Sequence, residues 1–165
     1  IYNAFGVKSK FIRLMPNTPC LLGEGMTGMY SNNNVTIEEK NVVETIFNTL
    51  GKTLMVQNEE ELDVVTGISG SGPAFLYQLA SYVSEISKRS SLSESDVITL
   101  FSQTMVGAGK MLLESEQSPQ QLIEQVSSPG GTTVAGLEVL KNSNVKHDFK
   151  SVILAAIERS KELGK

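Results

Sequence analysis

The sequence of 165 residues has few of the side chains from which disulfides and metal sites are built. It contains one cysteine, Cys20, and one histidine, His147. A single cysteine excludes a disulfide within the chain and is typical of a reducing compartment, so we expect a cytoplasmic protein. Because a zinc site of the usual type needs several His and Cys ligands, we also expect no bound metal.

Long apolar runs and clusters of basic residues are missing as well. No apolar stretch approaches the roughly 18 residues that are needed to cross a bilayer. The start of the chain has no continuous apolar segment like that of a secretory signal. The net charge is −4 and no basic stripe is present, which disfavours nucleic acid as the main partner. We therefore expect a protein that binds neither membranes nor nucleic acid.

The sequence is poor in patterns that supply general acids and bases. No Ser/His/Asp or Cys/His set has a supporting pattern, and His147 stands alone near a predicted helix start. Instead, three loops rich in glycine, proline and hydroxyl residues lie at the junctions between predicted elements, at residues 16–19, 66–74 and 127–133. Such loops suit chemistry in which a cofactor reacts while the protein positions the ligands, and hydride transfer is the leading example.

The first third of the sequence predicts a small α/β layer. Extended segments are expected at residues 10–15, 23–30 and 53–56. Thr36 and Glu39 have the spacing of a capping box at the start of a helix, and Gly51 follows the end of that helix. Residues 1–57 therefore form only half of an α/β layer, which leaves a sheet edge and apolar surface uncovered.

From Asn58 onward the sequence predicts helices only. We expect helices from Asn58, from Phe75 to Lys88, from Ser93 to about Ser115, from Ser118, through Val134–Leu140, and from His147 to Leu163. A glycine-rich turn is expected between the first two, at residues 66–74. Gly107 and Gly109 inside the long helix cost about 1 kcal/mol each relative to alanine. A closely crossing helix, from this chain or from a second subunit, would compensate for that cost.

The loop Ser127–Thr133 has the composition of a small anion site. Pro129 fixes one φ angle, the pair Gly130–Gly131 adopts dihedrals closed to other residues, and the next helix turn has free N–H groups. The nearest cationic side chains in the sequence are Lys110 and Lys141. A carboxylate or a single phosphate would therefore be held mainly by N–H groups and hydroxyls. A tight turn between helices is the alternative that the loop alone leaves open.

Taken together, the three loops closely resemble those of pyrroline-5-carboxylate reductases. The matching motifs are Arg13–Pro19, Asp63–Ala74 and Ser127–Thr133, with the connecting pieces Gly23–Thr27 and Gly107–Ser115. The resemblance implies a mainly α fold, in which a helical dimerisation domain follows the last strands and helix of a Rossmann-type α/β domain. Residues 1–57 would be the remnant of the dinucleotide-binding domain, and residues 58–165 the all-helical dimerisation and substrate-binding domain. The front of the family's dinucleotide fold would lie upstream of Ile1.

The same resemblance implies an oxidoreductase of proline biosynthesis that uses NADPH or NADH. It would transfer a hydride to the C=N bond of 1-pyrroline-5-carboxylate and give L-proline. The substrate-binding residues would be Ser128, Gly130, Gly131, Thr132 and Thr133. Thr133 would also be the catalytic residue, because its hydroxyl would face the imine nitrogen as a hydrogen-bond donor. The protein would form a homodimer or a higher homo-oligomer.

The cofactor-binding residues implied by the resemblance are Pro16, Asn17, Thr18 and Thr66, which would lie against the nicotinamide ring and its carboxamide. Glu116 matches a position that is often acidic in the family. Two alternatives stay open: a catalytically inactive helical dimerisation module, and a related reductase that acts on another imine or keto acid. We expect residues 1–165 alone to have no detectable reductase activity, because most of the cofactor cleft would be missing.

Overall fold

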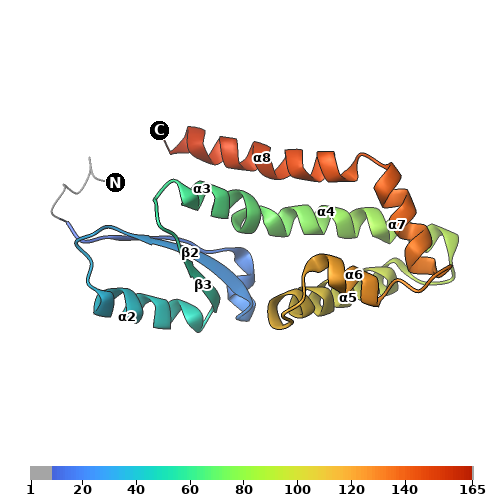
Figure 1. Ribbon diagram of the computed structural model, residues 1–165, viewed down its shortest axis with the longest axis horizontal. Helices are drawn as coiled ribbons and strands as arrows, with labels where there is room; N and C mark the ends of the chain where they lie inside the picture. The colour runs from blue at the N-terminus through green and yellow to red at the C-terminus, as the bar shows by residue number, and fades with distance from the viewer. Residues whose placement is uncertain (1–8, 165) are drawn as a thin grey trace. The chain divides into compact units, whose positions relative to one another are not determined.

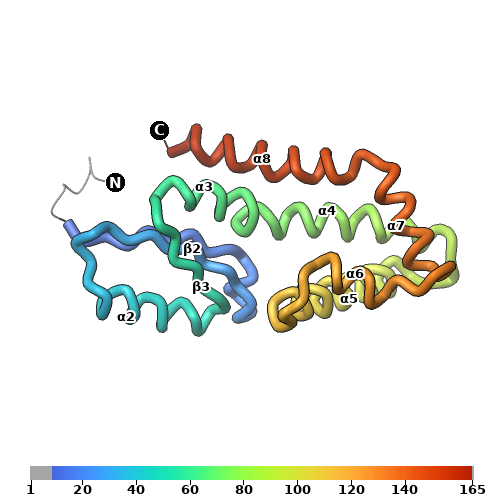
Figure 2. Tube along the Cα trace, viewed as in Figure 1, coloured from blue at the N-terminus to red at the C-terminus, as the bar shows by residue number. Residues whose placement is uncertain are grey.

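The computed structural model describes residues 9–164, and their path is shown in Figures 1 and 2. The chain divides into two compact units. The first contains the described residues up to Phe75 together with those from Ser151 onward, and the second is Leu76–Lys150. These units differ from the two domains expected from the sequence, whose boundary lies between residues 57 and 58. That domain boundary stays a prediction.

The first unit is built on a three-stranded sheet in the order β1-β2-β3. β1 (Ile12–Met15) runs antiparallel to β2 (Gly25–Ser31), with Met15 opposite Gly28. β3 (Gly51–Met55) runs parallel to β2, with Gly25 opposite Gly51. The three predicted extended segments are thus confirmed, although their ends differ slightly from those expected.

Helix α2 (Ile37–Asn48) connects β2 to β3, as the capping pattern predicts. The Glu39 N–H donates to Thr36 Oγ1 (3.3 Å), and the Thr36 N–H donates to Glu39 Oε2 (2.8 Å), so the capping box is complete. Gly51 then enters β3 with a φ angle of 143°. A side chain at this position would collide with the backbone of Gly25, which explains why the strand begins with glycine.

Figure 1 shows α2 and α3 (Glu61–Val65) on opposite faces of the sheet. Gly28 of β2 permits the contact with α3, because a Cβ there would lie 2.7 Å from Val65 Cγ1. The buried apolar side chains of the first unit are Met29, Val35, Leu62, Val65 and Ile157. The core of this unit therefore lies between the sheet, α3 and the end of α8 (Val145–Leu163).

The glycine-rich segment after α3 corrects one prediction. We expected a turn between two helices, but Thr66–Gly70 forms a π-helical turn, η2, that leads into α4 (Gly72–Ser84). The Ser71 N–H donates to the Thr66 carbonyl (2.8 Å), as the wider π spacing requires. The glycines of η2 permit close packing, because a Cβ at Gly67 would lie 2.4 Å from Ile157 Cγ1 of α8.

The second unit is helical throughout. After α4 the chain continues through the short 3-10 helix η3 (Glu85–Arg89), α5 (Glu94–Glu114), α6 (Pro119–Gln125) and α7 (Thr132–Asn142). Capping boxes start α5 at Ser93 and α6 at Ser118, which confirms the two predicted helix starts. Val97 is the single buried hydrophobic side chain among residues 76–150. Most apolar side chains of this unit are therefore accessible in the single chain.

Candidate functional site

The loop Ser127–Thr133 joins α6 to α7. The Ser127 hydroxyl donates to the Ile123 carbonyl (2.6 Å), which ties the start of the loop to the end of α6. The Gly131 N–H donates to the Ser128 carbonyl (2.9 Å) and closes a tight turn around Pro129 and Gly130. Gly130 has a φ angle of 70°, so the turn uses proline and glycine where a type II turn favours them. The backbone thus returns sharply into the start of α7.

The amino-terminal end of α7 differs from the other capped helix starts. Thr36, Ser93 and Ser118 cap α2, α5 and α6 with side-chain oxygens. Gly131 caps α7 with an extended backbone, and within residues 9–164 no side chain completes this cap. The first backbone bond along α7 is from the Ala135 N–H to the Gly131 carbonyl (3.3 Å).

Three N–H groups at this helix end consequently have no acceptor from the preceding turn of the helix. They belong to Thr132, Thr133 and Val134, and they point out of the helix toward the loop. Their partial positive charge adds to that of the helix dipole, which favours an anion at this end. Ser128 and Thr132 are exposed at this helix end, and Thr133 is half-buried. The five predicted substrate-binding residues lie in this one turn.

The predicted cofactor-binding residues form a second cluster, which belongs to the first unit. Pro16 and Asn17 follow β1, Thr18 begins the 3-10 helix η1 (Thr18–Leu22), and Thr66 begins η2. The Asn17 amide group donates to the carbonyl of Ser69 (3.2 Å) and to its hydroxyl (3.3 Å). Two segments far apart in the sequence therefore meet at Asn17 and Ser69. Sequence reasoning missed the role of Ser69, although this residue lies inside one of the three motifs.

The residues of this second cluster differ in hydrogen bonding and in exposure. The Thr66 hydroxyl donates to the Leu62 carbonyl (2.7 Å), so its proton is engaged within the helix. Pro16 and Thr18 are exposed, whereas Asn17 is half-buried. Pro16 and Thr18 are therefore the more accessible members of this cluster.

Titratable groups contribute little to either cluster. His147 is exposed at the start of α8, with Nδ1 3.1 Å from Asp148 Oδ1, and Glu116 is also exposed. The part of the chain that the structure describes contains no group of three or more His, Cys, Asp or Glu side chains that could hold a metal ion. Hydrogen bonds from Ser93 hold the pKa of the Asp96 carboxyl below its usual range, but Asp96 caps a helix. The chemistry available at the loops is therefore that of neutral hydrogen-bond donors.

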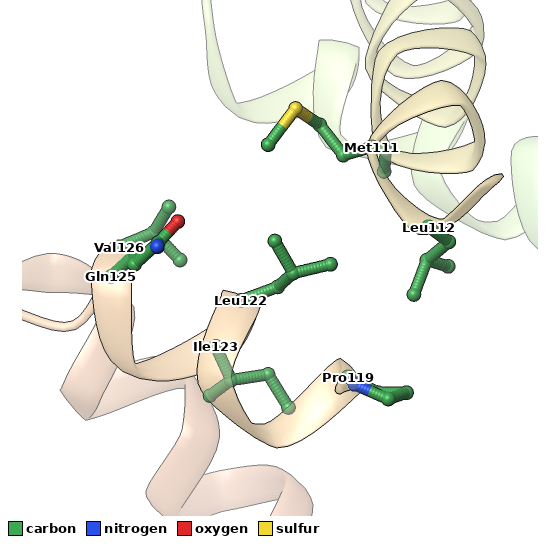
Figure 3. A pocket seen from close by; sticks show the side chains of 8 residues that line it. Met111, Leu112, Pro119, Leu122, Ile123, Gln125 and Val126 are labelled. Atoms are coloured by element: carbon green, nitrogen blue, oxygen red, sulfur yellow. The ribbon is translucent and has the colours of Figure 1, made fainter. Parts of the chain in front are cut away.

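An apolar groove lies between α5 and α6, with a volume of about 390 Å³. It is lined by Ala108, Met111, Leu112, Pro119, Leu122, Ile123, Gln125 and Val126, most of which Figure 3 shows around the open space. A lining of this kind does not suit a charged substrate. It suits contact with other apolar side chains.

Fold and site together define a class of protein, in which a small α/β layer leads into a helical region that contains a helix start without a side-chain cap. The family described as pyrroline-5-carboxylate reductase dimerisation matches residues 59–163. The chain belongs to the pyrroline-5-carboxylate reductase family, as the three loops predicted. Its mainly helical fold, preceded by the strands of an α/β layer, is also confirmed.

Individual relatives agree with this assignment. The chain is 35% identical to a pyrroline-5-carboxylate reductase from Methanosarcina acetivorans over 95% of its own length and 58% of the relative's. It is 34% identical to pyrroline-5-carboxylate reductase 1 from Bacillus subtilis, with 92% of this chain and 51% of the relative aligned. The chain thus spans little more than half the length of these curated relatives.

Two solved structures are similar over almost the whole chain. The pyrroline-5-carboxylate reductase of Coxiella burnetii has a TM-score of 0.93 and 36% identity, and the match covers 99% of this chain and 61% of that one. The Plasmodium falciparum pyrroline carboxylate reductase, crystallised with NADP bound, has a TM-score of 0.88 and 36% identity over 99% and 62% of the two chains.

Among the described helices of the present chain, none combines the length and the apolar character of a membrane span.

Proposed function

We propose that this chain is part of an enzyme that reduces the C=N bond of 1-pyrroline-5-carboxylate to L-proline with NADPH or NADH. Membership of the reductase family supports the reaction class. The observation that carries the proposal is the amino-terminal end of α7, where three backbone N–H groups lack an acceptor in the helix and no side chain of the described residues caps them. Such an end is suited to the carboxylate that both the substrate and the product carry.

The carboxylate would be held by backbone donors and hydroxyl groups. The N–H groups of Thr132 and Thr133 point toward it, and the exposed hydroxyls of Ser128 and Thr132 add further donors. Because the Gly131 N–H already donates to Ser128, we assign Gly130 and Gly131 the role of shaping the turn around the ligand. Their missing side chains leave room for the acid group.

Thr133 would act at the imine. Its side chain leaves the helix one residue after the first helical position, on the turn that would hold the carboxylate. A bound nicotinamide would supply a hydride to the imine carbon, and the ring nitrogen would take up one proton from solvent water to become the secondary amine of proline. An alcohol is too weak an acid to release its proton freely, so the Thr133 hydroxyl would orient the nitrogen and stabilise the developing amine by a hydrogen bond.

The cofactor would meet the first unit through the segment Pro16–Thr18 and Thr66. The exposed Thr18 hydroxyl and the backbone of this loop have the donors and acceptors that a nicotinamide carboxamide needs. The relative from Plasmodium falciparum binds NADP, which supports a nicotinamide cofactor here. A cytoplasmic location stays a prediction based on the single cysteine.

We also propose that the protein works as a homodimer or a higher homo-oligomer. Among residues 76–150, only Val97 is a buried hydrophobic, while Leu113 and Val139 are 69% and 70% exposed. Apolar surface of this extent usually marks a contact with another protein surface. A second copy is the partner that the dimerisation family supports.

The proposed reaction is tested with the protein as its gene encodes it. The purified protein is mixed with 1-pyrroline-5-carboxylate and either NADPH or NADH, and cofactor oxidation and L-proline are both measured. We expect oxidation and proline in equal amounts. No turnover of this substrate, with turnover of another cyclic imine or a keto acid, would instead favour the related reductase. No turnover of any of them would favour the inactive dimerisation module.

A further inference from the structure

Asn17 stands where the pairing of β1 with β2 would continue. Met15 is opposite Gly28 in the antiparallel register, and two more steps would place Asn17 opposite Met26. Pro16 has no N–H group and ends the backbone pairing. In its place, Asn17 Oδ1 accepts a hydrogen bond from the Met26 N–H (2.9 Å). The side chain therefore takes over a role that a strand backbone would normally have.

Asn17 also occupies the N-cap position of η1, where asparagine usually caps the helix with its own side chain. Within the described part of the chain its side chain makes no such bond, although its backbone carbonyl accepts from the Cys20 N–H (3.2 Å). Instead, its amide nitrogen reaches Ser69 in η2, at 3.2 Å from the carbonyl and 3.3 Å from the hydroxyl. A locally favoured use of the side chain has been replaced by a contact between distant segments.

The neighbouring contacts fix the same junction. A Cβ on Gly70 would lie 2.5 Å from Met15 Cε, so the end of β1 and the end of η2 approach closely. The Thr66 hydroxyl is bound to the Leu62 carbonyl (2.7 Å), which sets its orientation at the start of η2. Both polar ends of the Asn17 carboxamide are thus engaged by protein, while Pro16 and Thr18 on either side of it are exposed.

We propose that Asn17 is a positioning residue, which joins the loop after β1, the start of β2 and the turn η2 through its carboxamide. It holds the exposed groups of Pro16 and Thr18 at a fixed place relative to Thr66. The ligand contacts of this loop then come from the neighbours of Asn17 and not from its side chain. This role rests on the proposed function, in which the loop and Thr66 bind the nicotinamide end of the cofactor.

The first arm of the test measures amide hydrogen exchange by NMR in the full gene-encoded protein. In Asn17→Ala the Met26 N–H loses its acceptor, and we expect its exchange to become about tenfold faster. The Gly25 N–H is an internal control, because it donates to the Leu50 carbonyl (2.9 Å) and should keep its rate. Unchanged exchange at Met26 would overturn the proposal, and this arm needs no catalytic activity.

The second arm measures kcat and KM with the same variant. We expect kcat to fall about tenfold to a hundredfold, because a displaced cofactor loop misplaces the hydride. The KM for 1-pyrroline-5-carboxylate should stay within about twofold, since Asn17 is not among the substrate-binding residues. A purely structural role would lower the melting temperature and leave kcat unchanged, and that result would contradict the proposal.

A second variant of Asn17 keeps the test decisive if Asn17→Ala does not fold, and a variant of Asn48 serves as its control. Asn17→Asp keeps an acceptor for Met26 but sets a carboxylate oxygen against the Ser69 carbonyl, so Met26 should stay protected while kcat falls. Asn48→Asp is the matched control in the same unit. Asn48 Oδ1 accepts a hydrogen bond from the Thr53 hydroxyl (3.0 Å), which the aspartate keeps, so kcat should not change.

The remaining outcomes separate the two proposals. Loss of kcat with normal Met26 exchange in Asn17→Ala would show that Asn17 contacts the ligand directly, which contradicts the positioning role. Faster Met26 exchange with normal kcat would limit Asn17 to the fold, which also contradicts it. Absence of reductase turnover in the unsubstituted protein would overturn the proposed function, and with it the role of Asn17 toward the cofactor.

Discussion

Thr133 offers a ligand two donors at one position of the chain. Its N–H is one of the three groups at the start of α7 without an acceptor in the helix, and its half-buried hydroxyl lies on the same turn. A single residue can therefore bind the acid group with its backbone and face the imine nitrogen with its side chain. An alanine substitution removes the side-chain donor and leaves the backbone donor in place.

We predict that Thr133→Ala lowers kcat about 10²-fold, the usual effect of removing one donor that stabilises developing charge. Thr133→Ser keeps the hydroxyl and should retain most of the activity. Steady-state kinetics of both variants, with the oligomer size measured by light scattering, test this. Equal kcat values for the alanine variant and the unsubstituted protein would remove Thr133 from the mechanism.

At the residue scale, the sequence predicted those features of the site that depend on neighbouring residues in the chain. The proline and the glycines of Ser127–Thr133 determine a tight turn by their own backbone preferences, so this loop could be predicted. The partners of Asn17 could not, because Ser69 approaches it only in the folded chain. Local rules favoured a helix cap for Asn17, and tertiary contacts overrode them.

At the scale of single elements, the π-helical turn η2 is where the sequence was misleading. Glycines at residues 67, 70 and 72 with Pro73 have the composition of a loop, but here Gly67 and Gly70 are needed for close contact. Ile157 of α8 and Met15 of β1 occupy the space that side chains at Gly67 and Gly70 would need. Composition alone does not distinguish these two uses of glycine.

We predict that Gly67→Ala destabilises the fold by about 1 to 3 kcal/mol, because the added methyl group overpacks a buried contact. Its Cβ would lie 2.4 Å from Ile157 Cγ1 and 3.1 Å from the Ile157 backbone nitrogen. Gly72→Ala is the control, since a Cβ there has no described heavy atom within 4 Å. The free energy of unfolding in urea is the measurement, and equal values for the two variants would contradict the close contact.

The helix starts at Thr36, Ser93 and Ser118 were predicted from the sequence, and the capping box at Ser93 predicts a dependence of stability on pH. The Ser93 hydroxyl (2.6 Å) and then the Ser93 N–H (3.0 Å) hold the pKa of Asp96 below its usual range. A lowered pKa in the folded state means that this carboxylate stabilises the fold above the ordinary aspartate pKa. The contribution is lost as the pH falls through the lowered folded value.

We therefore predict that Asp96→Asn loses less stability than the unsubstituted protein when the pH is lowered from neutral to about 3. The equivalent box at Ser118 uses the neutral Gln121, so the cost of Gln121→Ala should not change over the same range. Thermal unfolding followed by circular dichroism at several pH values tests both. Parallel pH curves for Asp96→Asn and the unsubstituted protein would contradict the prediction.

At the scale of the whole molecule, the second unit has helices without a core of its own. The helix starts and the apolar faces could be predicted from sequence because caps and periodicity are local. What covers those faces could not, because the covering surface is not part of the same chain in the proposed assembly. The apolar groove between α5 and α6 belongs to this accessible surface.

We predict that Leu113→Asp, on α5, weakens self-association by at least about tenfold, because it places a charge in apolar surface that a second copy would cover. The matched control is Leu21→Asp, which should not alter the oligomer because Leu21 lies outside residues 59–163, the part that the dimerisation family matches. Analytical ultracentrifugation over a range of concentrations measures the effect. A dimer of unchanged affinity in Leu113→Asp would exclude this part of α5 from the interface.

The most direct measurement is a crystal structure of the gene-encoded protein with L-proline and the oxidised cofactor. The account predicts that the proline carboxylate accepts hydrogen bonds from the N–H groups of Thr132 and Thr133, with the Thr133 hydroxyl facing the ring nitrogen. A carboxylate bound at any other place in the molecule, with the start of α7 empty, would contradict it.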